Sequence, residues 1–210
     1  MRCPLCKSKE TSDYYSNKRR EFLQCGNCDL VFVPEKYHLS AEEEKKRYDL
    51  HENDPQDKGY RNFLNRLAVP LNERLRPKSN GLDFGSGPGP TLSAILEQNG
   101  HTVDIYDYFY SDDKKVLQKK FNFITATEVF EHLRAPIETI ELIWELLSPG
   151  GILGVMTKLV IDREAFCTWH YITDRTHICF FSQMTFKWLA DKLKAKIEFI
   201  GNDVILLYKS

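Results

Sequence analysis

The stretch Gly81-Leu82-Asp83-Phe84-Gly85-Ser86-Gly87-Pro88-Gly89-Pro90 decides the fold of this 210-residue chain. Leu82 and Phe84 supply a short apolar strand. Three glycines then follow at alternate positions: Gly85, Gly87 and Gly89. Glycine lets the backbone turn tightly and approach a ligand closely, and the N–H groups that open the next helix, over 91–96, then point at the ligand's anionic part. The stretch therefore predicts a strand, a turn and a helix that together cradle a nucleotide.

The spacing of the glycines separates this turn from the dinucleotide-binding type. A dinucleotide site has G-x-G-x-x-G, in which the third glycine seats the helix under a pyrophosphate, whereas this chain has G-x-G-x-G. Asp83, inside the strand, suits a ligand that carries a cationic group and no pyrophosphate. The motif resembles the first motif of the class I S-adenosylmethionine-dependent methyltransferases. The resemblance implies that Asp83, Ser86 and the three glycines contact this cofactor.

Residues 101–107 predict a second strand that ends in a carboxylate. Asp107 stands 22 residues after Gly85, where an acid can accept the protons of both ribose hydroxyls. Asp104 is the second candidate for this role, and either acid can instead simply cap the end of the strand. We expect Asp107 and the adjacent Tyr108 to contact the cofactor.

Two later stretches resemble further parts of the same family, in the same order. Residues 121–128 form an apolar run before a helix start at 129–133, like the family's fourth strand and the loop that touches the adenine. Thr127 and Glu128 are therefore expected beside the cofactor. Residues 146–156 read as a helix stopped by Pro-Gly-Gly and then a strand, like the entry to the family's fifth strand.

The resemblance implies an α/β, Rossmann-like sheet that is mostly parallel and has an antiparallel last strand. Two apolar runs at 196–200 and 204–208 flank a Gly-Asn-Asp turn and predict the hairpin that closes this sheet. Only 13 residues separate Asp107 from Phe121, which is room for a short strand or one helical turn but not for both at full length. We therefore expect a compact edge there.

Six cysteines fall into two groups. Cys3-x-x-Cys6 and Cys25-x-x-Cys28 form two knuckles 18 residues apart, a spacing that presents four thiolates to one Zn²⁺. All four ligand positions would be filled by protein, so the metal's role is expected to be structural. Redox or disulfide pairs are the alternative, which a reducing compartment disfavours. Cys167 and Cys179 are expected to be buried apolar residues.

The chain divides by composition into three parts: a zinc ribbon at 1–34, a helical linker or lid at 35–78, and a methyltransferase domain at 79–210. Ser40 and Glu43 form a capping box before a charged, exposed helix at 41–48. A second helix over about 60–75 carries one apolar stripe, made by Phe63, Leu64, Leu67 and Leu71. Residues 51–54 stand where a lid loop would lie, although a solvated linker fits them equally.

The chemistry of the acceptor points to the turn after the fourth strand. Glu128, Glu131 and His132 stand at i, i+3 and i+4, so all three can point into the cleft at the carboxyl end of the sheet. Such a set can hold a hard divalent cation, Mg²⁺ or Mn²⁺. It resembles the E-x-x-E-H of ubiquinone-pathway O-methyltransferases and of small-RNA 2′-O-methyltransferases, where a bound metal activates a hydroxyl. In the RNA enzymes a later histidine completes the set, and His177 is its counterpart here.

Metal-free chemistry stays open, because many metal-free methyltransferases carry the same motif. In that case Glu128 lies near the adenine, His132 caps or stacks, and His177 or His170 acts as the base. Both histidines belong to the stretch 169–182, which is too aromatic and too polar together for plain core and resembles the acceptor loop of broad methyltransferase families of unknown substrate. The candidate catalytic residues are therefore His177, His132, Glu131 and His170.

Composition limits the partners. The net charge is −1, so no whole-chain field draws the protein to nucleic acid or to a membrane. No apolar run is long enough for a signal peptide or a membrane span, which predicts a cytoplasmic protein. We expect methyl transfer to a small molecule, at oxygen. The only support for an RNA partner is the run of three basic residues at 18–20. A zinc-ribbon binding module with an inactive methyltransferase-like domain is the competing class of function.

Overall fold

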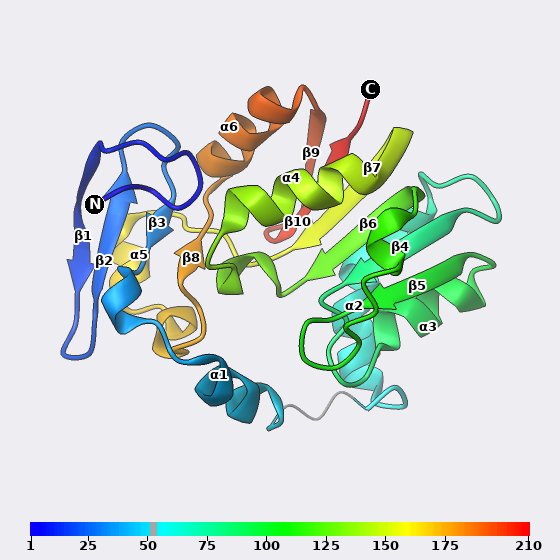
Figure 1. The fold of residues 1–210 in the computed structure, drawn as a ribbon, viewed down its shortest axis with the longest axis horizontal. Coiled ribbons are helices and arrows are strands. Elements are labelled where there is room, and N and C mark those ends of the chain that lie inside the picture. Colours follow the sequence, from blue (N-terminus) through cyan, green and yellow to red (C-terminus); the bar gives the residue numbers. More distant parts are fainter. Residues whose placement is uncertain (51–53) are drawn as a thin grey trace.

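The computed structural model describes residues 1–50 and 54–210. Three of the four residues of the predicted lid loop, 51–53, lie outside the described residues, so that loop stays a prediction. The described part has a six-stranded sheet in the order β5-β4-β6-β7-β10-β9 (Figure 1). The strands are β4 (Asn80–Phe84), β5 (Thr102–Tyr106), β6 (Phe121–Thr127), β7 (Leu147–Met156), β9 (Lys196–Ile200) and β10 (Val204–Tyr208).

The directions of the strands confirm the predicted sheet. β5, β4, β6 and β7 run parallel, whereas β10 is antiparallel to both β7 and β9. Phe84 pairs with Tyr106, and Thr127 pairs with Met156, so these parallel strands end at one common edge. Ligands of open α/β sheets bind outside this carboxyl edge. Between β5 and β6 the chain makes only one 3-10 turn, Val116–Gln118, which is the compact edge that the short spacing predicts.

Helices cover both faces of the sheet, and each face has its own core. α2 (Lys58–Asn72) and α3 (Thr91–Gln98) pack on one face, while α4 (Pro136–Leu146) and α6 (Gln183–Leu193) lie on the other (Figure 1). In α2 the predicted stripe is buried at Leu64, Leu67 and Leu71, but Phe63 is only partly buried. No helix in the described part of the chain combines the length and the apolarity that a membrane crossing needs.

The N-terminal ribbon, residues 1–34, forms a second sheet that the sequence did not predict in full. Its strands β1 (Thr11–Ser16), β2 (Glu21–Cys25) and β3 (Val31–Phe32) are completed by β8 (Cys179–Phe180). β8 belongs to residues 163–182, which we call the acceptor segment, and this segment also holds α5 (Arg163–Cys167) and the 3-10 turn His170–Thr173. The ribbon therefore shares a sheet with a distant segment of the chain, since β3 pairs Val31 with Phe180 and Phe32 with Cys179.

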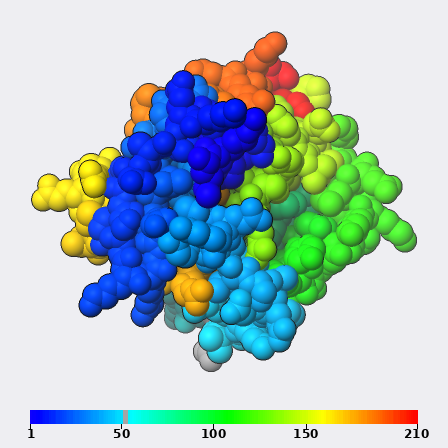
Figure 2. All heavy atoms as spheres, turned by 60° about the vertical axis from the view of Figure 1, so that its left-hand side comes forward, coloured from blue at the N-terminus to red at the C-terminus, as the bar shows by residue number. Residues whose placement is uncertain are grey.

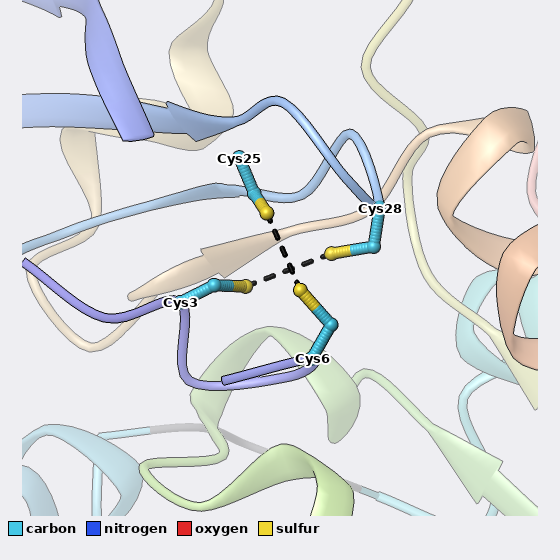
Figure 3. A group of neighbouring side chains, drawn as sticks. All are labelled: Cys3, Cys6, Cys25 and Cys28. Carbon is cyan, nitrogen blue, oxygen red and sulfur yellow. Dashed lines mark hydrogen bonds between the residues drawn. The ribbon is translucent and has the colours of Figure 1, made fainter. Parts of the chain in front are cut away.

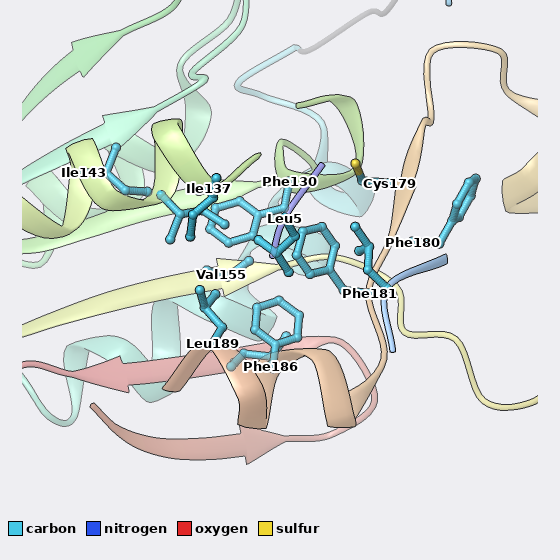
Figure 4. Packing of buried hydrophobic residues seen from close by; sticks show 14 of the residues in the cluster. Leu5, Phe130, Ile137, Ile143, Val155, Cys179, Phe180, Phe181, Phe186 and Leu189 are labelled. Carbon is cyan, nitrogen blue, oxygen red and sulfur yellow. The ribbon is translucent and has the colours of Figure 1, made fainter. Parts of the chain in front are cut away.

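The ribbon and the α4/α6 face of the central sheet also share one hydrophobic core. Leu5, between the first two cysteines, is fully buried near Phe130 and Phe181, as Figure 4 shows. The three-part division at 34/35 and 78/79 stays a prediction, since these contacts join the first part to the third. One expectation is wrong: Cys167 is exposed, because Phe166 occupies the buried side of the short helix α5 and turns Cys167 outward. Cys179 is buried as expected.

Helix α1 (Ala41–Tyr48) follows a 3-10 turn at Glu35–Tyr37. The predicted capping box is present, because Ser40 Oγ accepts from Glu43 N at 3.3 Å and Ser40 N donates to Glu43 Oε2 at 2.9 Å. The expectation of a fully exposed helix is wrong. Glu44 is buried and accepts a hydrogen bond from Arg134 at 2.7 Å, and this ion pair fixes one side of α1 to the main domain.

Candidate active site

A cavity of about 1100 Å³ opens at the carboxyl edge of the parallel strands. The loops after β4, β5 and β6 form one side, and α1 with the acceptor segment forms the other. Figure 2 views the molecule from the ribbon side, where part of the acceptor segment (orange) emerges between the dark-blue ribbon and the light-blue residues around α1. The cavity thus lies where the second and third parts of the chain meet.

The glycine turn has the backbone that only glycine adopts without strain. Gly85 and Gly87 have φ values of +76° and +66°. A Cβ on Gly85 would lie 2.4 Å from Cγ2 of Val129, so a side chain here would fill the approach to the cavity. Asp107 locks the turn, because its Oδ2 accepts from Gly87 N at 2.9 Å while its Oδ1 accepts from Phe109 N at 2.8 Å.

The structure brings most of the predicted cofactor residues into the cavity wall: Gly85, Ser86, Gly87, Asp107, Tyr108, Thr127 and Glu128. Asp83 and Gly89 do not line it. The Asp83 carboxylate lies beneath the turn, accepting from Ser93 Oγ at 3.0 Å and Thr125 Oγ1 at 2.8 Å, and burial raises its pKa to about 6. Asp104, the second ribose candidate, points elsewhere and pairs with Lys119 at 2.8 Å.

Buried polar atoms without a partner gather at this cavity. In the described part of the chain four buried side-chain oxygen or nitrogen atoms lack a hydrogen-bond partner, and three of them belong to cavity residues: Ser86 Oγ, Thr127 Oγ1 and Glu128 Oε1. Buried polar groups in native proteins are almost always hydrogen-bonded. These atoms therefore fit a polar ligand, and the glycine turn fits the close approach that a nucleoside cofactor requires.

Two carboxyl groups meet one tyrosine at the floor of the cavity, where Glu128 and Tyr171 line the wall and Glu131 is buried behind them. Glu131 is fully buried, and Tyr171 Oη donates a short hydrogen bond to its Oε1 while Thr157 Oγ1 donates to its Oε2 at 3.0 Å. Tyr171 Oη also lies 3.3 Å from Glu128 Oε2. Burial raises the pKa of Glu128 and of Glu131 well above the usual range, and their mutual repulsion adds to the shift at Glu128. The pair therefore tends to hold a proton near neutral pH.

Two imidazoles complete the cluster. His132 and His177 have ring centroids 4.7 Å apart. Nδ1 of His177 lies 2.9 Å from the carbonyl oxygen of Tyr171, and Nδ1 of His132 lies 3.1 Å from that of Thr176. A ring nitrogen facing a carbonyl must donate, so each Nδ1 carries the proton and each Nε2 has a lone pair. Burial lowers the pKa of His177 far below its usual value, so its ring is neutral at pH 7.

Glu131, His132 and His177 offer ligand atoms that all lie within 4.8 Å of one another. Glu128, the fourth ligand predicted for a second metal, does not belong to this group, although its carboxylate reaches the same tyrosine hydroxyl. His170 stands apart, exposed at the cavity rim, with its Nε2 2.9 Å from Lys158 Nζ. The structure thus gathers His177, His132 and Glu131 into one cluster and leaves His170 outside it.

The four N-terminal cysteines converge at the base of the ribbon (Figure 3). Cys3 Sγ and Cys28 Sγ are 3.6 Å apart, and Cys6 Sγ and Cys25 Sγ are 3.3 Å apart. A disulfide would need about 2.05 Å, whereas thiolates at about 2.3 Å from a tetrahedral Zn²⁺ stand about 3.7 Å apart. The spacing of the sulfurs fits a metal site and does not fit disulfide bonds.

Sequence reasoning missed several residues of this site. Tyr171 and Lys158 line the cavity beside Glu128, and the Lys158 Nζ lies 5.4 Å from the centroid of the Tyr171 ring. Tyr48, at the end of α1, contacts two rings of this site. The centroid of its ring lies 5.7 Å from that of Phe109 and 5.4 Å from that of His132. The only available signal for Tyr171 was its place in the aromatic and polar stretch 169–182. Nothing in the local pattern of α1 pointed to Tyr48.

The protein is a class I S-adenosylmethionine-dependent methyltransferase. This class is defined by the order of the strands in the sheet, the glycine turn after β4 and the acid at the end of β5. The chain belongs to the methyltransferase domain family whose model matches residues 51–197. No curated protein matches the sequence significantly.

Solved structures of methyltransferases share this fold at low sequence identity. The 1,6-didemethyltoxoflavin-N1-methyltransferase of Burkholderia thailandensis, solved with 1,6-didemethyltoxoflavin and S-adenosylhomocysteine, gives a TM-score of 0.55 at 14% identity, over 95% of this chain and 99% of that one. An O-methyltransferase family protein from the same organism gives a TM-score of 0.51 at 14% identity, over 79% of this chain and 62% of that one. The plantazolicin methyltransferase BpumL was solved in complex with a monoazolic desmethylPZN analog and S-adenosylhomocysteine. It gives a TM-score of 0.50 at 17% identity, over 80% of this chain and 90% of that one.

Proposed function

We propose that this enzyme methylates an oxygen of a small molecule bound beside the cofactor in the 1100 Å³ cavity. The observation that carries the proposal is the partly buried Glu128, whose Oε1 has no partner and whose pKa is raised, at the boundary between the glycine turn and the acceptor segment. A general base works best with a pKa near the working pH. An alcohol or phenol needs such a group, because its oxygen must lose a proton when it is methylated.

The glycine turn and Asp107 would hold the cofactor. The Gly87 N–H already points at the cavity edge beside Asp107, whose carboxylate stands where ribose hydroxyls can donate to it. When bound, S-adenosylmethionine supplies a methyl group on a positively charged sulfur. Because that group is already activated, the protein's own task is to position the acceptor and to remove its proton.

The acceptor would lie between aromatic side chains and the carboxyl pair. Tyr48, Phe109 and Tyr171 present rings to the cavity, which favours a flat, partly apolar acceptor. Glu128 would take the proton of the acceptor hydroxyl as the methyl group passes from the cofactor's sulfur to the oxygen, so that the oxygen–methyl bond forms while the sulfur–methyl bond breaks and its electron pair stays on sulfur. Tyr171, which donates to Glu131, keeps the second carboxylate in place beside it.

A divalent cation is a further part of the proposal. Glu131, His132 and His177 would hold it, since each offers one ligand atom and these atoms lie within 4.8 Å of one another. Such a cation lowers the pKa of a hydroxyl that binds it. Two imidazoles and one carboxylate suit Mn²⁺ better than Mg²⁺, which prefers oxygen ligands.

Zinc at Cys3, Cys6, Cys25 and Cys28 is also part of the proposal, as a structural ion with no position left for a substrate. Its support is the convergence of four sulfurs at distances that fit a tetrahedral site. The metal-free N- or C-methyltransferase and the inactive binding module remain the competing hypotheses, and the experiment below separates all three.

The test uses the full chain with its zinc retained, S-adenosylmethionine that carries a deuterated methyl group, and extracts of small molecules and of RNA. Mass spectrometry should find a labelled small molecule whose methyl group is bound to oxygen. The Glu128→Gln variant should lose at least about 100-fold in rate, while Glu97→Gln, an exposed helical residue, should match the wild type. A label on nitrogen or carbon would replace the oxygen proposal, and cofactor binding without any labelled product would favour the binding module.

A further inference from the structure

We propose that Arg20 is a positioning residue that ties the N-terminal ribbon to the acceptor half of the active site. Arg20 stands in the ribbon turn just before β2 and is only 4% exposed. Among the residues that the structure describes, its guanidinium donates only to backbone carbonyls of the acceptor segment. The inference rests on the proposed function in one respect: that Tyr171 and His177 serve the acceptor.

Four carbonyl groups receive hydrogen bonds from this one side chain. Nη1 donates to His177 O at 2.8 Å and to Arg175 O at 3.4 Å. Nη2 donates to Ile172 O at 2.8 Å and to Asp174 O at 2.6 Å. Three of these carbonyls, at Asp174, Arg175 and His177, belong to irregular backbone, and the fourth, at Ile172, lies in the short 3-10 turn before it. The planar fork of arginine presents five N–H groups in fixed directions and can serve four acceptors at once, whereas the ammonium of lysine has three.

The energetic balance supports an ordering role. A charge that is removed from water is costly unless it is paired or fully hydrogen-bonded, and no ion pair of Arg20 occurs among the described residues. Burial lowers the pKa of Arg20 to about 10, which reflects that cost. The hydrogen bonds to the four carbonyls offset the cost of removing the guanidinium charge from water. Arg20 and the acceptor segment therefore stabilise each other only when they are in register.

The same stretch of backbone presents the site's side chains on its inner face. His177 accepts from Arg20 through its carbonyl while its Nδ1 donates to the carbonyl of Tyr171 at 2.9 Å. Ile178 N donates to the carbonyl of Glu131 at 2.8 Å and joins this stretch to the floor of the cavity. Moving the backbone outward would therefore withdraw Tyr171 from Glu131 and His177 from His132.

Short connections join Arg20 and the acceptor segment to the cysteine cluster of the ribbon. Arg20 is followed directly by β2, which ends at Cys25. β2 pairs with β3, and β3 pairs with β8 of the acceptor segment. Asp29, next to Cys28, accepts from Ser182 Oγ at 2.5 Å at the far end of the segment. At its near end, Phe166 packs edge-on against Phe22 at 5.2 Å between centroids.

Through these contacts the ribbon supports the acceptor segment, although no residue of 1–34 lines the cavity itself. The cofactor turn makes none of them, because it is held by β4, β5 and Asp107. Loss of Arg20, or of the metal that fixes the ribbon, should loosen the acceptor segment while cofactor binding persists. The proposed zinc ion therefore acts on acceptor chemistry from outside the cavity.

The test measures hydrogen exchange by mass spectrometry on the zinc-loaded full chain. In Arg20→Lys, peptides covering 170–181 should exchange at least about tenfold faster, while peptides covering 81–96 and the affinity for S-adenosylmethionine should stay at wild-type values. Arg19→Lys, at the exposed neighbouring position, is the matched control and should change neither. Unchanged exchange over 170–181, or an equal rise across the whole chain, would overturn the proposal.

Chemical rescue separates positioning from a general loss of stability. Ethylguanidinium added to Arg20→Ala should restore protection over 170–181, and ethylammonium should not, since it lacks the planar fork. With a labelled acceptor in hand, Arg20→Lys should lower kcat and leave the KM for S-adenosylmethionine unchanged. If exchange responds as expected but the wild type transfers no methyl group to oxygen, the coupling stands and the proposed function fails. If transfer occurs but exchange and rescue do not respond, the coupling fails and the function stands.

Discussion

The two halves of the cavity are built in different ways. The cofactor half comes from neighbouring parallel strands, so Gly85, Gly87 and Asp107 lie within 22 residues of sequence and meet through one hydrogen bond at the strand ends. The acceptor half is assembled from α1, the turn after β6 and the acceptor segment, and the ribbon holds it from outside across a separation of 157 residues between Arg20 and His177.

From this difference we expect binding of the cofactor and chemistry on the acceptor to be separable. The sheet supports its own edge, because the strands that end there also form the core. The acceptor segment has only short elements and a two-residue strand, so it depends on partners far away in the sequence. The following variants test that separation, from the largest expected effect to the smallest.

The Cys25→Ser, Cys28→Ser double variant should have the largest effect. A structural zinc site contributes on the order of 10–16 kcal/mol in small domains, so the ribbon should unfold without it and release β8. Metal analysis should find no bound zinc, and transfer should fall by at least about 10³-fold. Calorimetry should find the affinity for S-adenosylmethionine within about threefold of the wild type. Cys167→Ser, which removes an exposed thiol outside the cluster, is the control; zinc retained by the double variant would contradict the assignment of the ligands.

Glu131→Gln should lower the transfer rate by about 10²–10⁴-fold without weakening cofactor binding. In protein that holds no second metal, the same change should raise the free energy of unfolding at pH 8. Because burial raises the pKa of Glu131, the folded state holds the proton more tightly than the unfolded state, and this contribution to stability is lost as the pH rises through the folded pKa. Melting curves should show the variant losing less stability than the wild type between pH 5 and pH 8. Glu145→Gln, on an exposed part of α4, should follow the wild-type pH profile.

Gly85→Ala tests the cofactor half alone. Its Cβ would lie 2.4 Å from Val129 Cγ2, at a φ of +76°, so the turn must shift away from the cavity. We expect the affinity for S-adenosylmethionine to fall about 100-fold, while hydrogen exchange over 170–181 is unchanged. Gly100→Ala also has a positive φ but meets no atom within 4 Å, so it shares the backbone strain without the clash. Equal loss of affinity in both variants would show that strain alone is responsible.

Asp107→Ala should have the smallest effect of the four. Removing hydrogen bonds to a charged group costs about 1.5–3 kcal/mol, which is roughly a 10- to 150-fold loss of cofactor affinity. Part of the loss comes from Gly87, whose N–H loses its acceptor. Asp104→Ala should bind the cofactor as the wild type does, since that carboxylate pairs with Lys119 outside the cavity. Titration calorimetry distinguishes the two acids directly.

Local patterns were sufficient to predict the backbone of the glycine turn, the closing hairpin of the sheet and the convergence of the four cysteines. Positive φ at Gly85 and Gly87, the acid at the end of β5 and the antiparallel hairpin β9–β10 all follow from residues close together in sequence. The four cysteines follow from their spacing alone. The details that failed were side-chain directions: Cys167 turned outward and Glu44 turned inward, because the packing of neighbouring elements decides them.

The amino-acid sequence by itself determined the glycine cradle, the Glu128, Glu131 and His132 spacing and the set of cysteines, since each depends on steric and periodic rules that act over a few residues. Only the tertiary structure decided that β8 completes the ribbon sheet, that Arg20 orders the acceptor segment and that Tyr171 joins Glu128 to Glu131. These contacts link residues 40 or more positions apart. No local pattern encodes them, because they form only when folding removes both partners from water.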